Sequence, residues 1–139
     1  MTNNIDNSYL DFIQDLKKKI ISAKSKAILS ANRLMIELYF DIGKGIVTKQ
    51  ELLGWGKSIV EQMSKDLIDE FGERSGYSTQ NLWYMRQFYL AYINKSNLQQ
   101  LVGEIPWGQN ILIFSKCKDT KEQEYYIKNT IEYGWNRNL

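Results

Sequence analysis

The chain has 139 residues, 43% of them hydrophobic, and a formal net charge of +2, which together predict one folded domain with a hydrophobic core. It contains no histidine and a single cysteine, Cys117, which excludes the commonest general base, histidine or cysteine clusters for metals, and an internal disulfide. No apolar run reaches the roughly 18 to 20 residues that a membrane-spanning helix needs, so we expect a cytoplasmic protein, and no motif indicates a cofactor.

The first predicted element is one long helix that begins near Tyr9 and ends near Val47, within a segment assigned to residues 1–50. Its apolar side chains recur at near-heptad steps of three and four: Tyr9, Ile13, Leu16, Ile20, Ala23, Ala27, Ala31, Leu34, Leu38 and Ile42. Such a helix is about 60 Å long at 1.5 Å per residue, so a small domain cannot cover the whole stripe. We therefore expect a homodimer in which a second copy of the chain covers part of it.

The basic charge is concentrated in the first half of the chain. Residues 1–16 carry three acidic and no basic side chains, whereas residues 17–65 carry ten Lys or Arg against four acids. Residues 66–139 carry eight basic and nine acidic side chains. A segment with this excess attracts phosphate, although lysines spread along a helix also form an ordinary solvated face, and both interpretations stay open.

Residues 54–139 are assigned to a helical bundle, and residues 56–93 within it have the outline of a helix-turn-helix. The first helix places its apolar side chains mostly at steps of three and four, which predicts one stripe packed against a core: Ile59, Met63, Leu67, Ile68 and Phe71. Gly72 and Gly76 suit the turn, and Ser78 can cap the next helix by accepting a hydrogen bond from its first turn. In a helix-turn-helix, the N-terminal side chains of the second helix reach base edges in the DNA major groove.

The second helix has two faces of different character. One face carries Leu82, Met85, Tyr89, Tyr92 and Ile93, and the opposite face carries Gln80, Trp83, Tyr84 and Gln87. The two glutamines could hydrogen-bond adenine bases, whereas Trp83 and Tyr84, with neighbouring Leu90, would bury equally well against protein. A DNA-recognition helix and a buried central helix of a bundle are therefore both open interpretations.

Two further helices are predicted after a polar break at residues 94–97. A short one covers residues 98–103, and the next continues to about Cys117. The apolar run 111–114 in the second of these is predicted to be deeply buried, with a strand as the alternative. The pattern indicates an all-α, multi-helix fold.

The last clear helix is bounded by residues that are typical caps. Asp119 or Thr120 can accept a hydrogen bond from its first turn, and Gly134 can end it after Tyr133. Asn136 can begin to cap another helix at the end of the chain.

Four short motifs occur in the order in which a known family has them. They are Gly54-Trp55-Gly56, the segment 81–89 with Asn81 and Arg86, Pro106-Trp107-Gly108, and the segment 133–138 with Trp135 and Arg137. With these motifs the chain resembles, over nearly its whole length, the N-terminal domain of the YhcG family of bacterial and phage proteins. The resemblance implies a helical domain that binds DNA or a protein partner and precedes a separate nuclease domain of the PD-(D/E)xK type, which would itself be a candidate partner.

Two departures from the family pattern bear on chemistry. Gln109 stands where the family usually has histidine, so no role of that imidazole transfers to this chain. The letters of the nuclease motif occur at Asp15-Leu16-Lys17 and Asp119-Thr120-Lys121, but in helical segments rather than on the strands that hold a divalent ion. We therefore expect a chain that is not an enzyme.

The sequence supports two hypotheses for function. The first is a non-catalytic DNA-binding or targeting domain of a YhcG-like nuclease system. Its candidate DNA contacts are Lys57, Arg74, Ser78, Thr79, Gln80, Trp83, Tyr84 and Gln87. The alternative is a protein-interaction and dimerisation module that does not bind DNA.

Overall fold

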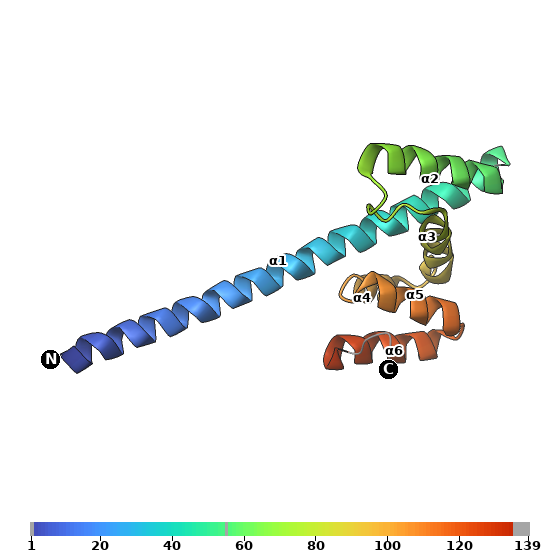
Figure 1. Ribbon diagram of the computed structural model, residues 1–139. Helices are drawn as coiled ribbons and strands as arrows, with labels where there is room; N and C mark the ends of the chain where they lie inside the picture. Colours follow the sequence, from blue (N-terminus) through green and yellow to red (C-terminus); the bar gives the residue numbers. More distant parts are fainter. Residues whose placement is uncertain (1, 55, 135–139) are drawn as a thin grey trace.

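The computed structural model describes residues 2–54 and 56–134, without the side chains of residues 2–6 and 8. Within these ranges the chain forms six α-helices and no strand, which confirms the all-α prediction (Figure 1). The helices are α1 (Thr2–Leu53), α2 (Lys57–Phe71), α3 (Thr79–Tyr92), α4 (Ser96–Val102), α5 (Trp107–Lys116) and α6 (Thr120–Tyr133). Among the residues described, no helix combines the length and the hydrophobicity that a bilayer span requires.

Helix α1 is a rod whose N-terminal half extends away from the other helices, while its C-terminal part packs among them (Figure 1). It is 52 residues long, or about 78 Å at 1.5 Å per residue, and so exceeds the predicted helix at both ends. The side chain of Asn32 marks the point where α1 meets the bundle, because its Nδ2 donates to the carbonyls of Gly103 (3.0 Å) and Ile105 (2.9 Å).

Helix α3 lies against the C-terminal part of α1 at very short range. A Cβ atom added at Gly43 would lie 2.7 Å from the carbonyl carbon of Met85 and 3.0 Å from Cβ of Tyr89. The missing side chain at Gly43 therefore allows the backbones of α1 and α3 to approach each other closely.

The hydrophobic core forms two clusters that share α1 and α3. The larger cluster consists of Ile36, Phe88, Tyr92, Leu98, Val102, Ile105, Ile113, Phe114 and Ile127. The smaller consists of Tyr39, Ile46, Val60, Leu82 and Met85. The half-buried indole of Trp107 joins them, since it packs edge-on against Tyr39 (ring centroids 4.8 Å apart) and Phe88 (5.2 Å). Because both clusters use α3, this helix is the centre of the bundle.

The C-terminal elements follow the predicted order, with two corrections. The strand alternative for 111–114 is wrong, because this run lies inside α5, where Ile113 and Phe114 are buried and the other two residues only half-buried. Cys117 is buried but lies just after α5 with an extended backbone, not in the helix.

The predicted caps of α6 are confirmed. The Asp119 side chain accepts from the Glu122 amide at 3.2 Å, and Gly134 ends the helix with a φ of 65°. The predicted cap at Asn136, and the motif residues Trp55, Trp135 and Arg137, lie outside the described residues.

Candidate interaction surfaces

The turn between α2 and α3 has the geometry that its residues predict. Gly72 and Gly76 take the positive φ angles of 98° and 91° that glycine accommodates best. Ser78 caps α3 by accepting from the Asn81 amide at 3.2 Å, and Ser64 donates from its hydroxyl to the carbonyl of Tyr77 at 2.8 Å. The two helices are therefore held by a fixed, short connection.

Helix α2 buries a slightly different face from the predicted one. Val60 and Ser64 are buried, whereas the predicted stripe residues Ile59, Met63, Leu67 and Ile68 are half-buried. Phe71 is 62% exposed, so its assignment to the core is wrong. It lies in the last turn of α2, where its ring meets that of Tyr77 (centroids 5.9 Å apart) rather than the bundle interior.

Helix α3 is enclosed on more sides than a recognition helix usually is. Its predicted apolar face is confirmed at Leu82, Met85, Tyr89 and Tyr92, but Ile93 follows the helix and is 41% exposed. Phe88 is also fully buried, although the sequence did not place it on that face. The helix contacts α1, α2, α4 and α5, which leaves its first turn as its most accessible part.

The eight candidate DNA contacts are not brought together on one open surface. Lys57, Arg74, Ser78 and Gln80 are exposed, and Thr79, Trp83, Tyr84 and Gln87 are half-buried. Lys57 begins α2, whereas Arg74 follows the other end of that helix. The two ends of α2 are about 21 Å apart at 1.5 Å per residue.

Several of these side chains have partners within the bundle. Gln80 donates from Nε2 to the Tyr84 hydroxyl at 3.3 Å, and the Tyr84 ring packs against Phe114 at 6.3 Å. The guanidinium carbon of Arg86 lies 5.7 Å from the centre of the Trp83 ring. The structure thus leaves Arg74, Ser78 and Gln80 at the turn as the accessible group among the residues near α3.

The family-motif residues that the structure describes have structural contacts. The Asn81 side chain donates to the carbonyl of Gly76 at 2.5 Å and accepts from the Trp107 indole at 2.7 Å, so it ties the turn and α3 to α5. Arg86 donates from Nε to Oε1 of Gln50 at 2.7 Å, which joins α3 to α1. These residues fix the arrangement of the helices.

The remaining motif residues lie at helix ends or in the bundle. Gly54 follows α1 with a φ of 65°, Gly56 precedes α2, and Pro106 precedes α5. Gly108 is half-buried and Gln109 is 9% exposed, both in the first turn of α5.

Next to Gln109 is a buried polar residue that the sequence analysis missed. Asn110 is fully buried, and its Nδ2 donates to the carbonyls of Val102 (3.1 Å) and Ile105 (3.3 Å). The signal for such a role was the position of Asn110 directly before the apolar run 111–114.

Two buried tyrosines have raised pKa values. Burial raises the pKa of the Tyr39 hydroxyl, with a smaller contribution from Tyr77, and burial also raises the pKa of Tyr92. Each shift favours the neutral form and is explained by burial in the core. Among the residues described, no group of three His, Cys, Asp or Glu side chains is placed to hold a metal ion.

Most of the near-heptad stripe of α1 is not covered by the rest of the chain. Five of its large side chains are exposed: Tyr9 (60%), Leu16 (38%), Ile20 (46%), Leu34 (67%) and Leu38 (45%). Ile13 is half-buried, and Ile42, at the end of the stripe, is half-buried against the smaller core cluster. The residues of α1 that are buried in the bundle are Ile36, Tyr39, Gly43, Ile46 and Val47. At 100° per residue the stripe lies about 140° around the helix from these buried positions. Helix α1 therefore has two apolar faces, and the bundle covers one of them over residues 36–47. On the projecting part of the helix this same face is exposed as well, at Ile21 (65%), Ile28 (69%) and Leu29 (54%).

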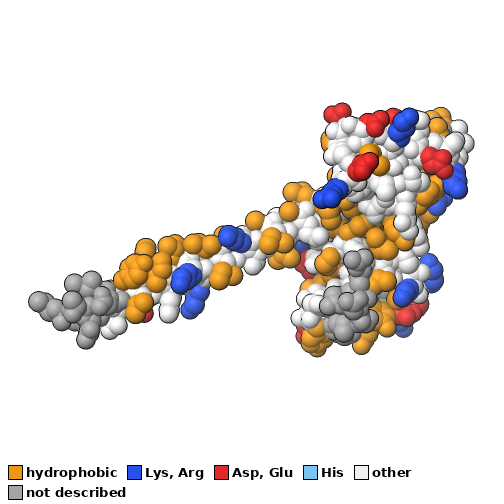
Figure 2. Space-filling model, viewed as in Figure 1, with side chains coloured by type: hydrophobic (Ala, Val, Ile, Leu, Met, Phe, Trp, Pro, Cys, Tyr) orange, Lys and Arg blue, Asp and Glu red, His pale blue; other side chains and the backbone are white. Residues whose placement is uncertain are grey.

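The space-filling view shows hydrophobic side chains along the projecting part of α1 (Figure 2). Where the stripe reaches the bundle, it enters an apolar groove of about 580 Å³ between α1 and α2, which we call the α1/α2 groove. From α1 it is lined by Leu38, Ile42, Gly45, Ile46 and one charged residue, Lys49, and from α2 and the turn after it by Met63, Leu67, Phe71 and Tyr77. The stripe and the groove form one continuous apolar surface.

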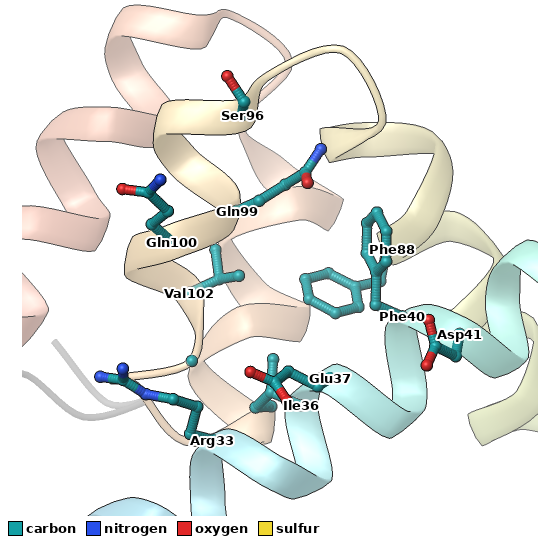
Figure 3. A pocket seen from close by; sticks show the side chains of 11 residues that line it. Arg33, Ile36, Glu37, Phe40, Asp41, Phe88, Ser96, Gln99, Gln100 and Val102 are labelled. Atoms are coloured by element: carbon teal, nitrogen blue, oxygen red, sulfur yellow. The ribbon is translucent and has the colours of Figure 1, made fainter.

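A second cavity, of about 430 Å³, lies between α1 and α4 and is more polar (Figure 3). Arg33, Glu37 and Asp41 reach it from successive turns of α1, with Phe40 and Phe88 on one wall. Arg33 pairs with Glu104 at 3.2 Å, in a contact exposed to solvent. Such exposed pairs contribute little to stability, and the cavity has no arrangement of groups that indicates a reaction.

Comparison with known proteins assigns the chain to a family. Residues 15–139 match the family model described as the DUF1016 N-terminal domain. The chain is also 32% identical over 88 residues to a protein of Escherichia coli (strain K12) named "Putative nuclease YhcG". That alignment covers 60% of this chain and 23% of the relative, so the chain spans less than a quarter of the relative's length. No solved structure matches it. Since the family model covers most of the chain, with the helical architecture described above, the chain belongs to the DUF1016 N-terminal domain family.

Proposed function

We propose that this chain is a non-catalytic interaction module that self-associates through the stripe of α1 and so assembles the nuclease system to which it belongs. The observation that carries the proposal is the exposure of the stripe on the face of α1 opposite the bundle. Large apolar patches on a protein surface usually mark sites of association, because burying them removes apolar area from water. The nuclease link comes from the name of the matched relative.

The stripe offers more to a helical partner than isolated surface leucines would. It follows a near-heptad repeat, which lets side chains of one helix fit between those of another along their length. Leu34 and Leu38 stay exposed even where α1 lies within the bundle, so folding of one chain does not hide the repeat. A second copy of the same helix is a partner that matches the repeat along its whole length.

The test is the mass of the protein in solution, measured by sedimentation velocity at tens of micromolar. We expect the unmodified protein to be a dimer and Leu34→Glu to be a monomer. Because Leu34 is 67% exposed in the single chain, its replacement should leave the melting of the bundle nearly unchanged. The matched control is Ser25→Glu, which adds the same charge to an exposed position on another face of α1 and should keep the dimer. A monomeric unmodified protein would refute the proposal.

DNA binding is the second candidate, and one observation favours it. The side chains of Gln80 and Arg74 are exposed around the turn that precedes α3, where helix-turn-helix proteins contact DNA. Gln80→Ala should then weaken binding to a preferred sequence by about 1 to 3 kcal/mol, whereas Arg74→Ala should weaken binding to all sequences alike. The assay is binding to mixed duplex DNA at two salt concentrations, because phosphate contacts are lost steeply as salt rises. Absence of binding at low salt would remove this candidate.

A further inference from the structure

We infer that the second copy lies antiparallel to the first, with the N-terminal part of its α1 in the α1/α2 groove. The inference rests on the self-association proposed above and adds the orientation and the docking site. By twofold symmetry, each copy then gives one helix end and receives the other, so both grooves are filled.

The side chains of the stripe are arranged almost symmetrically about residues 25 and 26. Large residues occur at both ends and alanines occur between them. An antiparallel pairing about this centre places the following residues opposite each other: Tyr9 and Ile42, Ile13 and Leu38, Leu16 and Leu34, Ile20 and Ala31, Ala23 and Ala27. The alanines allow the two helix axes to come close at the centre, since the distance between packed helices depends on the side chains at the contact.

The α1/α2 groove has room for the side chains that this pairing delivers. A Cβ atom at Gly45 would meet nothing within 4 Å, so the floor of the groove is open there. Phe71 at its rim is 62% exposed. The pairing brings Tyr9 and Leu10 of the partner, which are themselves 60% and 52% exposed, to the part of the groove near Ile42. Uncovered apolar side chains on both sides would thus be buried by the same contact.

The charges at this end of the pairing are mixed, because Asp11 and Asp15 of the entering segment are acidic, whereas the three lysines that follow them are complementary to the partner. Lys17, Lys18 and Lys19 follow the apolar residues that enter the groove, and they would lie near the C-terminal end of the partner's α2. That end carries Asp66, Asp69 and Glu70, and a helix C-terminus is itself partly negative. Lys24 and Lys26 meet like charges near the symmetry axis, but like charges on exposed helix faces cost only a few tenths of a kcal/mol.

Distances between spin labels distinguish the two orientations. In a Cys117→Ala background, one label is placed at Asn7→Cys and, in a second protein, at Ser25→Cys. The antiparallel dimer should give about 55 Å between the two labels at position 7, and less than about 20 Å between those at position 25. A parallel dimer should give short distances for both.

The groove is tested separately by a pair of substitutions at its floor. Gly45→Glu puts a carboxylate into the apolar groove, and we expect at least a tenfold increase in the dimer Kd. Gly45→Ala adds only a methyl group and should leave the Kd within about threefold, a difference of less than 1 kcal/mol. Circular dichroism checks that both variants keep their helix content.

The outcomes separate this inference from the proposal on which it rests. A dimer with a short distance at position 7, or a dimer whose Kd is unchanged by Gly45→Glu, overturns the antiparallel docking and leaves self-association standing. A monomer at tens of micromolar overturns both.

Discussion

Replacement of Gly43 by alanine should destabilise the protein, although the same change normally stabilises a helix. In an exposed helix interior, alanine is favoured over glycine by about 0.8 to 1 kcal/mol. At Gly43 the new Cβ would lie 2.7 Å from the carbonyl carbon of Met85, so the backbones of α1 and α3 would have to separate. Overpacking of this kind costs about 1 to 3 kcal/mol, and a backbone neighbour cannot rotate away as a flexible side chain can. We therefore expect a net loss of up to about 2 kcal/mol in the free energy of unfolding.

The matched control lies two residues further along the same helix. Gly45→Ala adds its methyl group where no atom lies within 4 Å, so it should raise the free energy of unfolding by about 0.5 to 1 kcal/mol. Urea denaturation followed by circular dichroism, at a protein concentration low enough to limit association, measures both changes. If Gly43→Ala were as stable as Gly45→Ala, the close approach of α1 and α3 described above would be wrong.

Three further predictions concern the core, the thiol and the absence of catalysis. Leu82→Ala should lower the free energy of unfolding by about 2 to 5 kcal/mol because Leu82 is fully buried. Gln80→Ala, on the exposed side of α3, should change it by less than about 0.5 kcal/mol, and denaturant titration of both variants measures the difference. Burial raises the pKa of the Cys117 thiol, so alkylation of the thiol at pH 8 should be slow until urea is added. The free energy of unfolding should also fall as the pH rises above the ordinary thiol pKa of 9.0, because the unfolded chain loses the thiol proton first. Plasmid DNA should remain uncleaved with magnesium or manganese, because Asp15 lies within α1, Asp119 caps α6, and no cluster of acids within residues 2–54 and 56–134, as described, is placed to hold the ion. Cleavage that survives repurification would contradict this.

The sequence predicted well those features that depend on neighbouring residues. Ser78 and Asp119 accept backbone hydrogen bonds three residues ahead, so a cap can be recognised from a short segment. Gly72 and Gly134 end their helices for an equally local reason, since glycine takes positive φ angles easily. The apolar stripe of α1 was also visible, because its spacing is a property of one helix.

The features that the sequence did not predict depend on contacts between distant segments. The hydrogen bond from the Trp107 indole to Asn81 joins residues 26 apart, and the one from Arg86 to Gln50 joins residues 36 apart. Phe71 was assigned to the core and Phe88 was not, because a helical wheel cannot show which neighbouring helix covers a face. The same limit applies to the candidate DNA contacts, whose exposure is decided by the position of α3 within the bundle.

The projecting half of α1 has a consequence for the folding of the molecule. Between Tyr9 and Ala31 every side chain is exposed except the half-buried Ile13, and the first hydrogen bond to the bundle is made by Asn32. An isolated helix is only marginally stable in water and frays, since most helical stability in proteins comes from tertiary packing. Amide hydrogens in this half should therefore exchange with solvent at nanomolar protein concentration while those of α3 stay protected, and they should slow as the concentration rises. The number of helical residues in each chain would then depend on the concentration of the protein.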